Sequence, residues 1–187
     1  MNYLIIDTAT KNLYIALVKD KEVVEELLLE GKNMHSKNAL YYIDQLTKKH
    51  AFDVEAVVCG KGPGSYTGVR IAVTIAKMFA VFKNIPLYST STLYLMSSGY
   101  DGKKLAYIDA RRGNSFLAVY EDDINILEEG LYNTTEKISL YQNYLIIDED
   151  NMKINPLKVI CNALLEHEPH AFTPNYLRDT EAERNLR

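Results

Sequence analysis

A glycine-rich stretch in the first half of the chain has the residue types of an anion-binding loop. Residues 60–70 read Gly-Lys-Gly-Pro-Gly-Ser-Tyr-Thr-Gly-Val-Arg and stand between an apolar run and a segment with helical spacing. Glycines let a backbone approach a ligand closely, and a helix N-terminus offers amide donors to a phosphate. The stretch is not a Walker A loop, because no Lys followed by Ser or Thr stands where that motif requires it. Two interpretations remain open: a tight structural turn, and a phosphate cradle that includes Gly62, Gly64 and Ser65.

Two aspartates, Asp7 and Asp109, each end a short apolar run. A carboxylate at the end of a strand can hold the water of a nucleotide-bound magnesium ion. The alternative is that each aspartate caps the turn that follows it. For Asp109, which precedes Arg111 and Arg112, an internal salt bridge is a further alternative. Together with the glycine loop, the two aspartates form a candidate vestigial nucleotide or phosphate site.

The other residues with chemical potential do not assemble into a recognisable centre. Pro169 prevents a regular helical pair between His167 and His170, which disfavours a zinc site. Cys59 and Cys161 stand in apolar runs and are expected to be buried thiols rather than a disulfide or metal ligands. No Ser-His-Asp or Cys-His group follows from the spacing. The sequence therefore predicts neither a catalytic residue nor a metal site.

The elements that carry these residues repeat once along the chain. Three short apolar runs in each half have the length of strands: 4–7, 13–18 and 23–29, then 105–109, 116–120 and 124–131. A shift of about 102 residues superimposes them, and it places Asp7 on Asp109 and Asp20 on Asp122. Ala16 and Ala118 also correspond. The pattern predicts a duplicated unit that begins with three antiparallel strands.

Helices and strands alternate in the rest of the chain. The spacing predicts helices at 37–49, 68–83, 91–98 and 156–166, and strands at 54–59, 86–89 and 145–147. Ser36 is expected to cap the first helix, and Pro156 stands in the first turn of the last. A βββαβα unit used twice is the α/β actin-like (ASKHA, ribonuclease H-like) architecture. We expect lobes at residues 1–99 and 100–187, with the second lobe shortened.

The helix predicted at 68–83 is apolar on more sides than one sheet can cover. Its interior polar residues, Arg70, Thr74 and Lys77, form a single narrow stripe. We expect its bulky side to face the sheet and its small side to receive a partner helix; the small side comprises Val69, Ala72, Val73, Ala76 and Ala80. The neighbouring helix would add Tyr41, Tyr42 and Gln45. The alternative is burial under another part of the same chain.

Composition limits the possible partners. The chain has 187 residues, of which 47% are hydrophobic, and a net charge of −4. This charge is not the basic footprint of a protein that binds nucleic acid alone. No apolar run is long enough to span a bilayer, and the first residues lack a basic leader. A cytoplasmic protein without membrane contact is expected.

Ordered motifs along nearly the whole chain resemble one known family. They are residues 5–10 (Ile-Ile-Asp-Thr-Ala-Thr), 35–36 (His-Ser), 62–71 (Gly-Pro-Gly-Ser-Tyr-Thr-Gly-Val-Arg-Ile), 76–77 (Ala-Lys), 91–93 (Ser-Thr-Leu), 109–113 (Asp-Ala-Arg-Arg-Gly), 174–178 (Pro-Asn-Tyr-Leu-Arg) and 182–183 (Ala-Glu). In this order they are similar to the TsaB (YeaZ) family. The second half is shorter than in typical members.

The resemblance implies a non-catalytic subunit that pairs with TsaD and, with TsaE, supports formation of N6-threonylcarbamoyladenosine beside the anticodon of tRNAs that read A-starting codons. It implies no cofactor of its own, with ATP and a divalent metal on TsaD, and tRNA contact only through the complex. Members use the first lobe's two helices to form a homodimer or the TsaD pair. The alternative is an enzyme of the actin-like superfamily, either a nucleotide-dependent phosphotransferase or a peptidase-like hydrolase.

Overall fold

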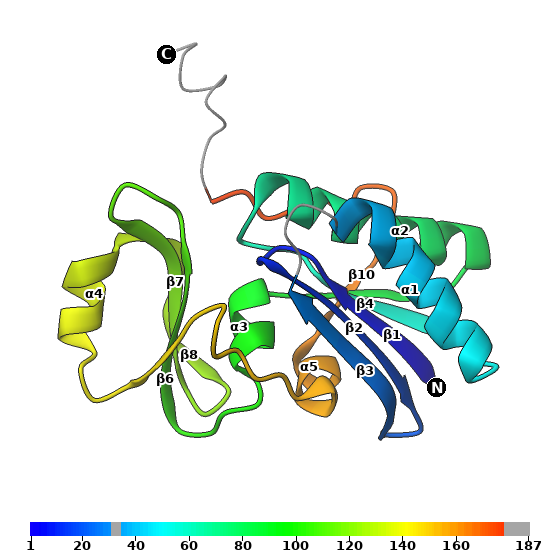
Figure 1. Cartoon of the computed structure of the whole chain (residues 1–187), viewed down its shortest axis with the longest axis horizontal. Helices are drawn as coiled ribbons and strands as arrows, with labels where there is room; N and C mark the ends of the chain where they lie inside the picture. Colours follow the sequence, from blue (N-terminus) through cyan, green and yellow to red (C-terminus); the bar gives the residue numbers. More distant parts are fainter. Residues whose placement is uncertain (31–34, 178–187) are drawn as a thin grey trace, which may run out of the picture.

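The first lobe is built on a six-stranded mixed sheet. The computed structural model describes residues 1–30 and 35–177. The strand order is β10-β5-β4-β1-β2-β3 (Figure 1). The strands are β1 (Asn2–Asp7), β2 (Asn12–Lys19), β3 (Glu22–Glu30), β4 (Ala56–Gly60), β5 (Leu87–Thr90) and β10 (Leu164–Glu166). Strands β1, β4 and β5 are parallel, so their carboxyl ends meet at one edge, where Asp7 and the glycine loop lie.

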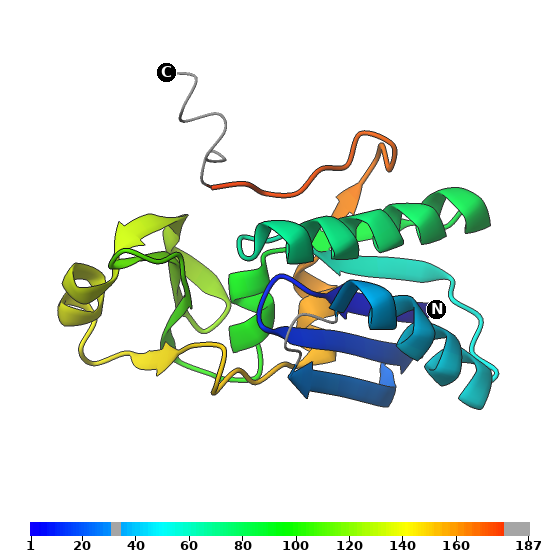
Figure 2. The ribbon, with the colours of Figure 1, turned by 45° about the horizontal axis from the view of Figure 1, so that its top comes forward.

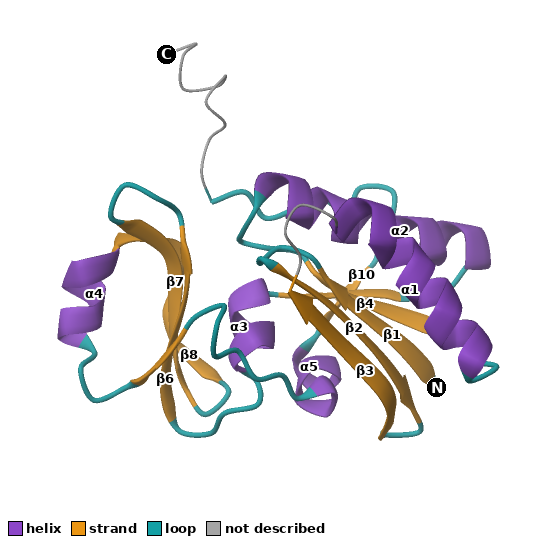
Figure 3. Cartoon of the chain, viewed as in Figure 1, coloured by secondary structure: helices purple, strands orange, loops and turns teal. Residues whose placement is uncertain are grey.

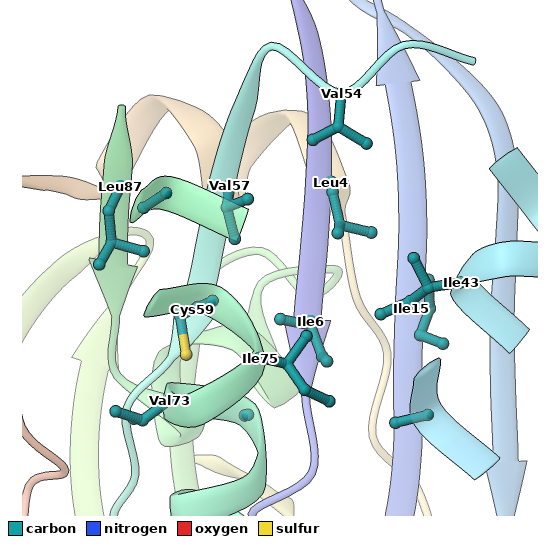
Figure 4. Packing of buried hydrophobic residues seen from close by; sticks show 14 of the residues in the cluster. Leu4, Ile6, Ile15, Ile43, Val54, Val57, Cys59, Val73, Ile75 and Leu87 are labelled. Carbon is teal, nitrogen blue, oxygen red and sulfur yellow. The ribbon is translucent and has the colours of Figure 1, made fainter. Parts of the chain in front are cut away.

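Helices cover both faces of this sheet (Figure 3). Helices α1 (His35–Lys49) and α2 (Tyr66–Lys83) pack on the face that carries Leu4, Ile6 and Ile15. In Figure 4, Ile43 of α1 and Ile75 of α2 point toward these strand residues. Helices α3 (Thr92–Ser97) and α5 (Pro156–Asn162) place Leu95 and Val159 against the residues of the opposite face, among them Ile5, Tyr14, Ala16 and Val58. Because side chains alternate along a strand, β1 supplies both cores.

The second lobe repeats the opening three-stranded unit. Its sheet has the order β8-β7-β6-β9 and consists of β6 (Lys103–Asp109), β7 (Asn114–Glu121), β8 (Ile124–Asn133) and β9 (Leu145–Ile147). Asp20 and Asp122, which the sequence repeat pairs, both have a left-handed backbone, with φ of 50° and 53°. The predicted duplication and the actin-like α/β fold are therefore confirmed. The second sheet also has a helix on it, because the α3 residues Leu93 and Met96 pack in its core.

Several boundaries differ from the prediction. Helix α4 (Thr134–Leu140), capped by Asn133, was not predicted. Helix α5 ends at Asn162 instead of residue 166, because residues 164–166 pair with β5 as strand β10. The lobe predicted at 100–187 is corrected accordingly, since its last strand belongs to the first sheet. Helix α1 begins at His35, so Ser36 lies within the helix and not at the cap position that was predicted for it. The motif residues at 178 and 182–183 lie outside the described residues.

The returning segment brings distant parts of the chain together. Figure 2 shows α5, β10 and residues 167–177 following the second lobe and running back over the first, past the start of α2. Throughout residues 1–30 and 35–177, no helix is both long enough and apolar enough to cross a membrane.

Candidate functional site

The glycine loop packs directly on the turn between β1 and β2. The Ser65 amide donates to the Ala9 carbonyl at 2.7 Å, and the Thr8 hydroxyl donates to the Gly68 carbonyl at 2.6 Å. A Cβ on Gly68 would lie 1.9 Å from the Thr8 carbonyl oxygen, and one on Gly64 would lie 2.4 Å from that of Ala9. The glycines are therefore needed for contact between two backbone segments, which favours the structural interpretation of the loop.

Asp7 is enclosed at the centre of this contact. Its side chain is only 2% exposed, and a Cβ on Gly60 would meet its carboxylate. One carboxylate oxygen accepts from the Ala9 amide at 2.7 Å and the other from the Thr92 hydroxyl at 2.6 Å. Burial raises the pKa of Asp7 to about 6, although the bonds from Thr92 and Ala9 lower it in part. Asp7 thus joins the first strand to the start of α3.

Thr92 connects Asp7 to the glycine loop. Its hydroxyl donates to Asp7 and accepts from the Gly62 amide at 3.1 Å, while its own amide donates to the Gly62 carbonyl at 2.9 Å. In the sequence, Thr92 stands out only as part of a family motif. The signal that could have identified it is the run of polar residues Ser91 and Thr92 that follows the buried strand β5 and opens α3.

Contacts within the chain already involve much of the candidate nucleotide site. Both Asp7 oxygens are already hydrogen-bonded, and the amides of Gly62, Ser65 and Gly68 have intramolecular partners. Asp109 is exposed at the end of β6, where it accepts from the Arg111 amide at 2.7 Å. Both aspartates therefore cap turns, as the structural alternative predicted. Among the residues that the structure describes, no three His, Cys, Asp or Glu side chains gather closely enough to hold a metal.

The structure buries the small side of α2 as well as Ile75 of its bulky side. Its small side faces inward, and all five residues of that side are in the core of this chain: Val69, Ala72, Val73, Ala76 and Ala80. They cannot contact a partner while the chain is folded as described. Small side chains let α2 lie close over β4 and β1, whose bulky residues fill the space between helix and sheet (Figure 4).

The outward side of the α1–α2 pair carries large apolar residues instead. Phe82 is 85% exposed and Val81 is also exposed, at the end of α2. On α1, Tyr41 is 58% exposed, and Leu40 and Gln45 are exposed. Tyr42 is half-buried against the first-lobe core. We call Leu40, Tyr41, Val81 and Phe82 the outer helix surface. The five small-side residues of α2 that were predicted to form the interface are therefore corrected to core residues, while the use of α1 and α2 as an interface stays a prediction.

Known proteins provide an independent comparison. A family described as "TsaD: tRNA N6-adenosine threonylcarbamoyltransferase" matches residues 29–155, more than half of the chain. The TsaB protein of Bacillus subtilis is 36% identical over 135 residues, which is 69% of this chain. That of Escherichia coli is 37% identical over 138 residues, or 70% of this chain.

The chain belongs to the TsaB family. It spans 59% of the length of each of these two TsaB relatives. The structure of YeaZ from Pseudomonas aeruginosa superimposes with a TM-score of 0.78 at 18% identity, and the match covers 94% of this chain and 99% of that one. This match supports the actin-like fold.

Four of the motifs that resembled the TsaB family, at residues 5–10, 62–71, 91–93 and 174–177, meet at one place in the fold. Residues 5–10, the glycine loop and the start of α3 are joined by the Asp7–Thr92–Gly62 contacts. The backbone amide of Asn175, in the motif that begins at residue 174, donates to the Lys61 carbonyl at 2.7 Å. The TsaB-family pattern in this chain thus marks a packed junction between segments.

Proposed function

We propose that this chain is a non-catalytic TsaB subunit that binds TsaD and, with TsaE, supports formation of N6-threonylcarbamoyladenosine beside the anticodon of tRNAs that read A-starting codons. Membership of the TsaB family supports the pathway, since relatives carry the name tRNA threonylcarbamoyladenosine biosynthesis protein. The observation that carries the partner role is Phe82, a large apolar side chain left 85% exposed on a helix that otherwise packs well.

The outer helix surface has the character of a protein interface. Its members are aromatic and aliphatic, and aromatic anchors supply much of the binding energy at such surfaces. Gln45 and the T-shaped Tyr41–Tyr42 pair, with ring centroids 5.4 Å apart, adjoin it on α1. We assign this surface to TsaD in the complex and to a second copy of the chain when it is alone.

The chemistry of the reaction belongs to the partner in this proposal. The buried Asp7, which accepts a hydrogen bond at each oxygen, and the intramolecular partners of the Gly62, Ser65 and Gly68 amides support a chain without its own nucleotide. ATP and the divalent metal are then held by TsaD, and tRNA is contacted only through the complex. We place the complex in the cytoplasm, without membrane contact.

Phe82→Glu is expected to weaken TsaD binding by about 100-fold or more, because it buries an unpaired charge in place of an aromatic anchor. Isothermal titration of each variant into purified TsaD from the same organism measures this. The matched control is Leu164→Glu, which places the same charge on a 68% exposed leucine of strand β10. Equal affinity of Phe82→Glu and the unmodified chain would remove the outer helix surface from the interface.

The enzymatic alternative has its own test. A phosphotransferase of the actin-like superfamily binds Mg-ATP without a partner, so the isolated chain is titrated with Mg-ATP. We expect no binding at micromolar nucleotide concentrations. Micromolar affinity would favour the alternative, whatever the outcome with TsaD.

A further inference from the structure

The last described residues, 170–177, form a strap along the first lobe. Phe172 is buried in the core beneath α2. The Lys77 ammonium group on α2 donates to the carbonyls of His170 at 2.8 Å and Phe172 at 3.1 Å. The ring of Tyr176 stacks on Tyr66, with 5.1 Å between centroids. The strap is thus attached to the first lobe at several points along its length.

At Asn175 the strap also binds the second lobe. The Asn175 side-chain amide donates to Glu129 on β8 at 2.6 Å. The other Glu129 oxygen accepts from the Ser91 hydroxyl, at the start of α3. Burial raises the pKa of Glu129. Since a half-buried carboxylate needs its donors, this junction joins the second sheet to the first lobe.

The strap also covers the glycine loop. The backbone amide of Asn175 donates to the Lys61 carbonyl, and a Cβ on Gly62 would lie 3.1 Å from the backbone carbonyl oxygen of Asn175. Leu177, two residues on, packs against the second-lobe core. One short segment therefore contacts the glycine loop and both lobes.

Ion pairs and a hydrogen bond form a second group of contacts at the other end of the boundary between the lobes. Lys158 of α5 forms ion pairs with Asp101, in the linker, at 2.6 Å and with Asp123 at 3.7 Å. The buried Lys104 donates to the Tyr100 carbonyl at 2.7 Å. Figures 1 and 2 both show the linker and α5 on one side of the lobe boundary and the strap on the other.

We propose that the strap is a latch that holds the two lobes at one relative orientation and covers the glycine loop. The linker and its Lys158 ion pairs form the pivot. Breaking the Asn175–Glu129 contact lets the second lobe turn about this pivot, while the strap stays bound to the first lobe and to the glycine loop. The inference goes beyond the proposed function and does not depend on it, because every contact lies within this chain.

The test measures the spread of distances between the lobes in the full chain. Spin labels are attached at Lys19→Cys in the first lobe and Gln142→Cys in the second, both exposed. The background is Cys161→Ser, because Cys161 is exposed, contrary to the expectation from its apolar neighbours; Cys59 is buried as expected and stays unlabelled. Double electron–electron resonance is expected to give one narrow distance distribution for this parent and a clearly broader one after Asn175→Ala.

Two further variants make the result specific. Glu129→Ala removes the same contact from the other side, so the double variant should broaden the distribution no further than either single change. Thr173→Ala is the matched control, an exposed strap residue, and should leave the distribution unchanged. The latch is overturned if Asn175→Ala and Glu129→Ala both keep the narrow parental distribution, or if Thr173→Ala broadens it equally.

Discussion

Gly68→Ala is expected to lower the free energy of unfolding by about 3 kcal/mol or more, although alanine is the better helix former. Gly68 stands in the first turn of α2, where helix propensity alone would favour alanine by about 1 kcal/mol. The new methyl group would lie 1.9 Å from the Thr8 carbonyl oxygen, so backbone on one side or the other has to move. Such overpacking usually destabilises by about 1–3 kcal/mol, and here the neighbour is rigid backbone.

Urea unfolding followed by circular dichroism measures this difference. Thr74→Ala on the same helix is the control, because Thr74 is exposed and its replacement should change stability by no more than about 0.5 kcal/mol. A Gly68→Ala chain as stable as the control would show that the loop and the β1–β2 turn are not in the close contact described.

Asp7→Asn is expected to change how stability depends on pH. The pKa of Asp7 is raised by burial from 3.8 to about 6 in the folded chain. The folded state therefore holds this proton more tightly than the unfolded state does. The resulting stabilisation is complete below pH 3.8 and is lost as the pH rises through about 6; a shift of about two units corresponds to about 3 kcal/mol.

Asparagine carries no such proton; its Oδ1 can accept from the Ala9 amide, and its NH2 group can donate to the Thr92 hydroxyl oxygen in place of the bond that Thr92 donates to Asp7. The free energy of unfolding of Asp7→Asn, measured relative to that of the unmodified chain, should therefore rise by about 2 kcal/mol from pH 4.5 to pH 7. Urea unfolding at the two pH values gives the difference. Asp109→Asn is the matched control, since Asp109 caps the equivalent turn but faces solvent. A stability difference for Asp7→Asn that is constant with pH would contradict the buried ionisable carboxyl group.

Prediction from the sequence was strongest where local pattern and repetition agree. The apolar runs of β1, β2, β6 and β7 follow the side-chain period of a strand, and their recurrence after about 102 residues revealed the duplicated fold. The short helix α4 escaped prediction because its seven residues bury no side chain completely and leave only a weak apolar pattern.

The sequence by itself determined the family, the duplicated actin-like architecture and the two helices that carry the exposed apolar surface. Only the tertiary structure decided which side of α2 faces outward, because alanine and valine are compatible with either a sheet or a partner helix. It also decided that the glycine loop packs on the backbone of the β1–β2 turn, and that Asn175 donates a hydrogen bond to Glu129. These outcomes depend on contacts between residues far apart in the chain, which no local spacing encodes.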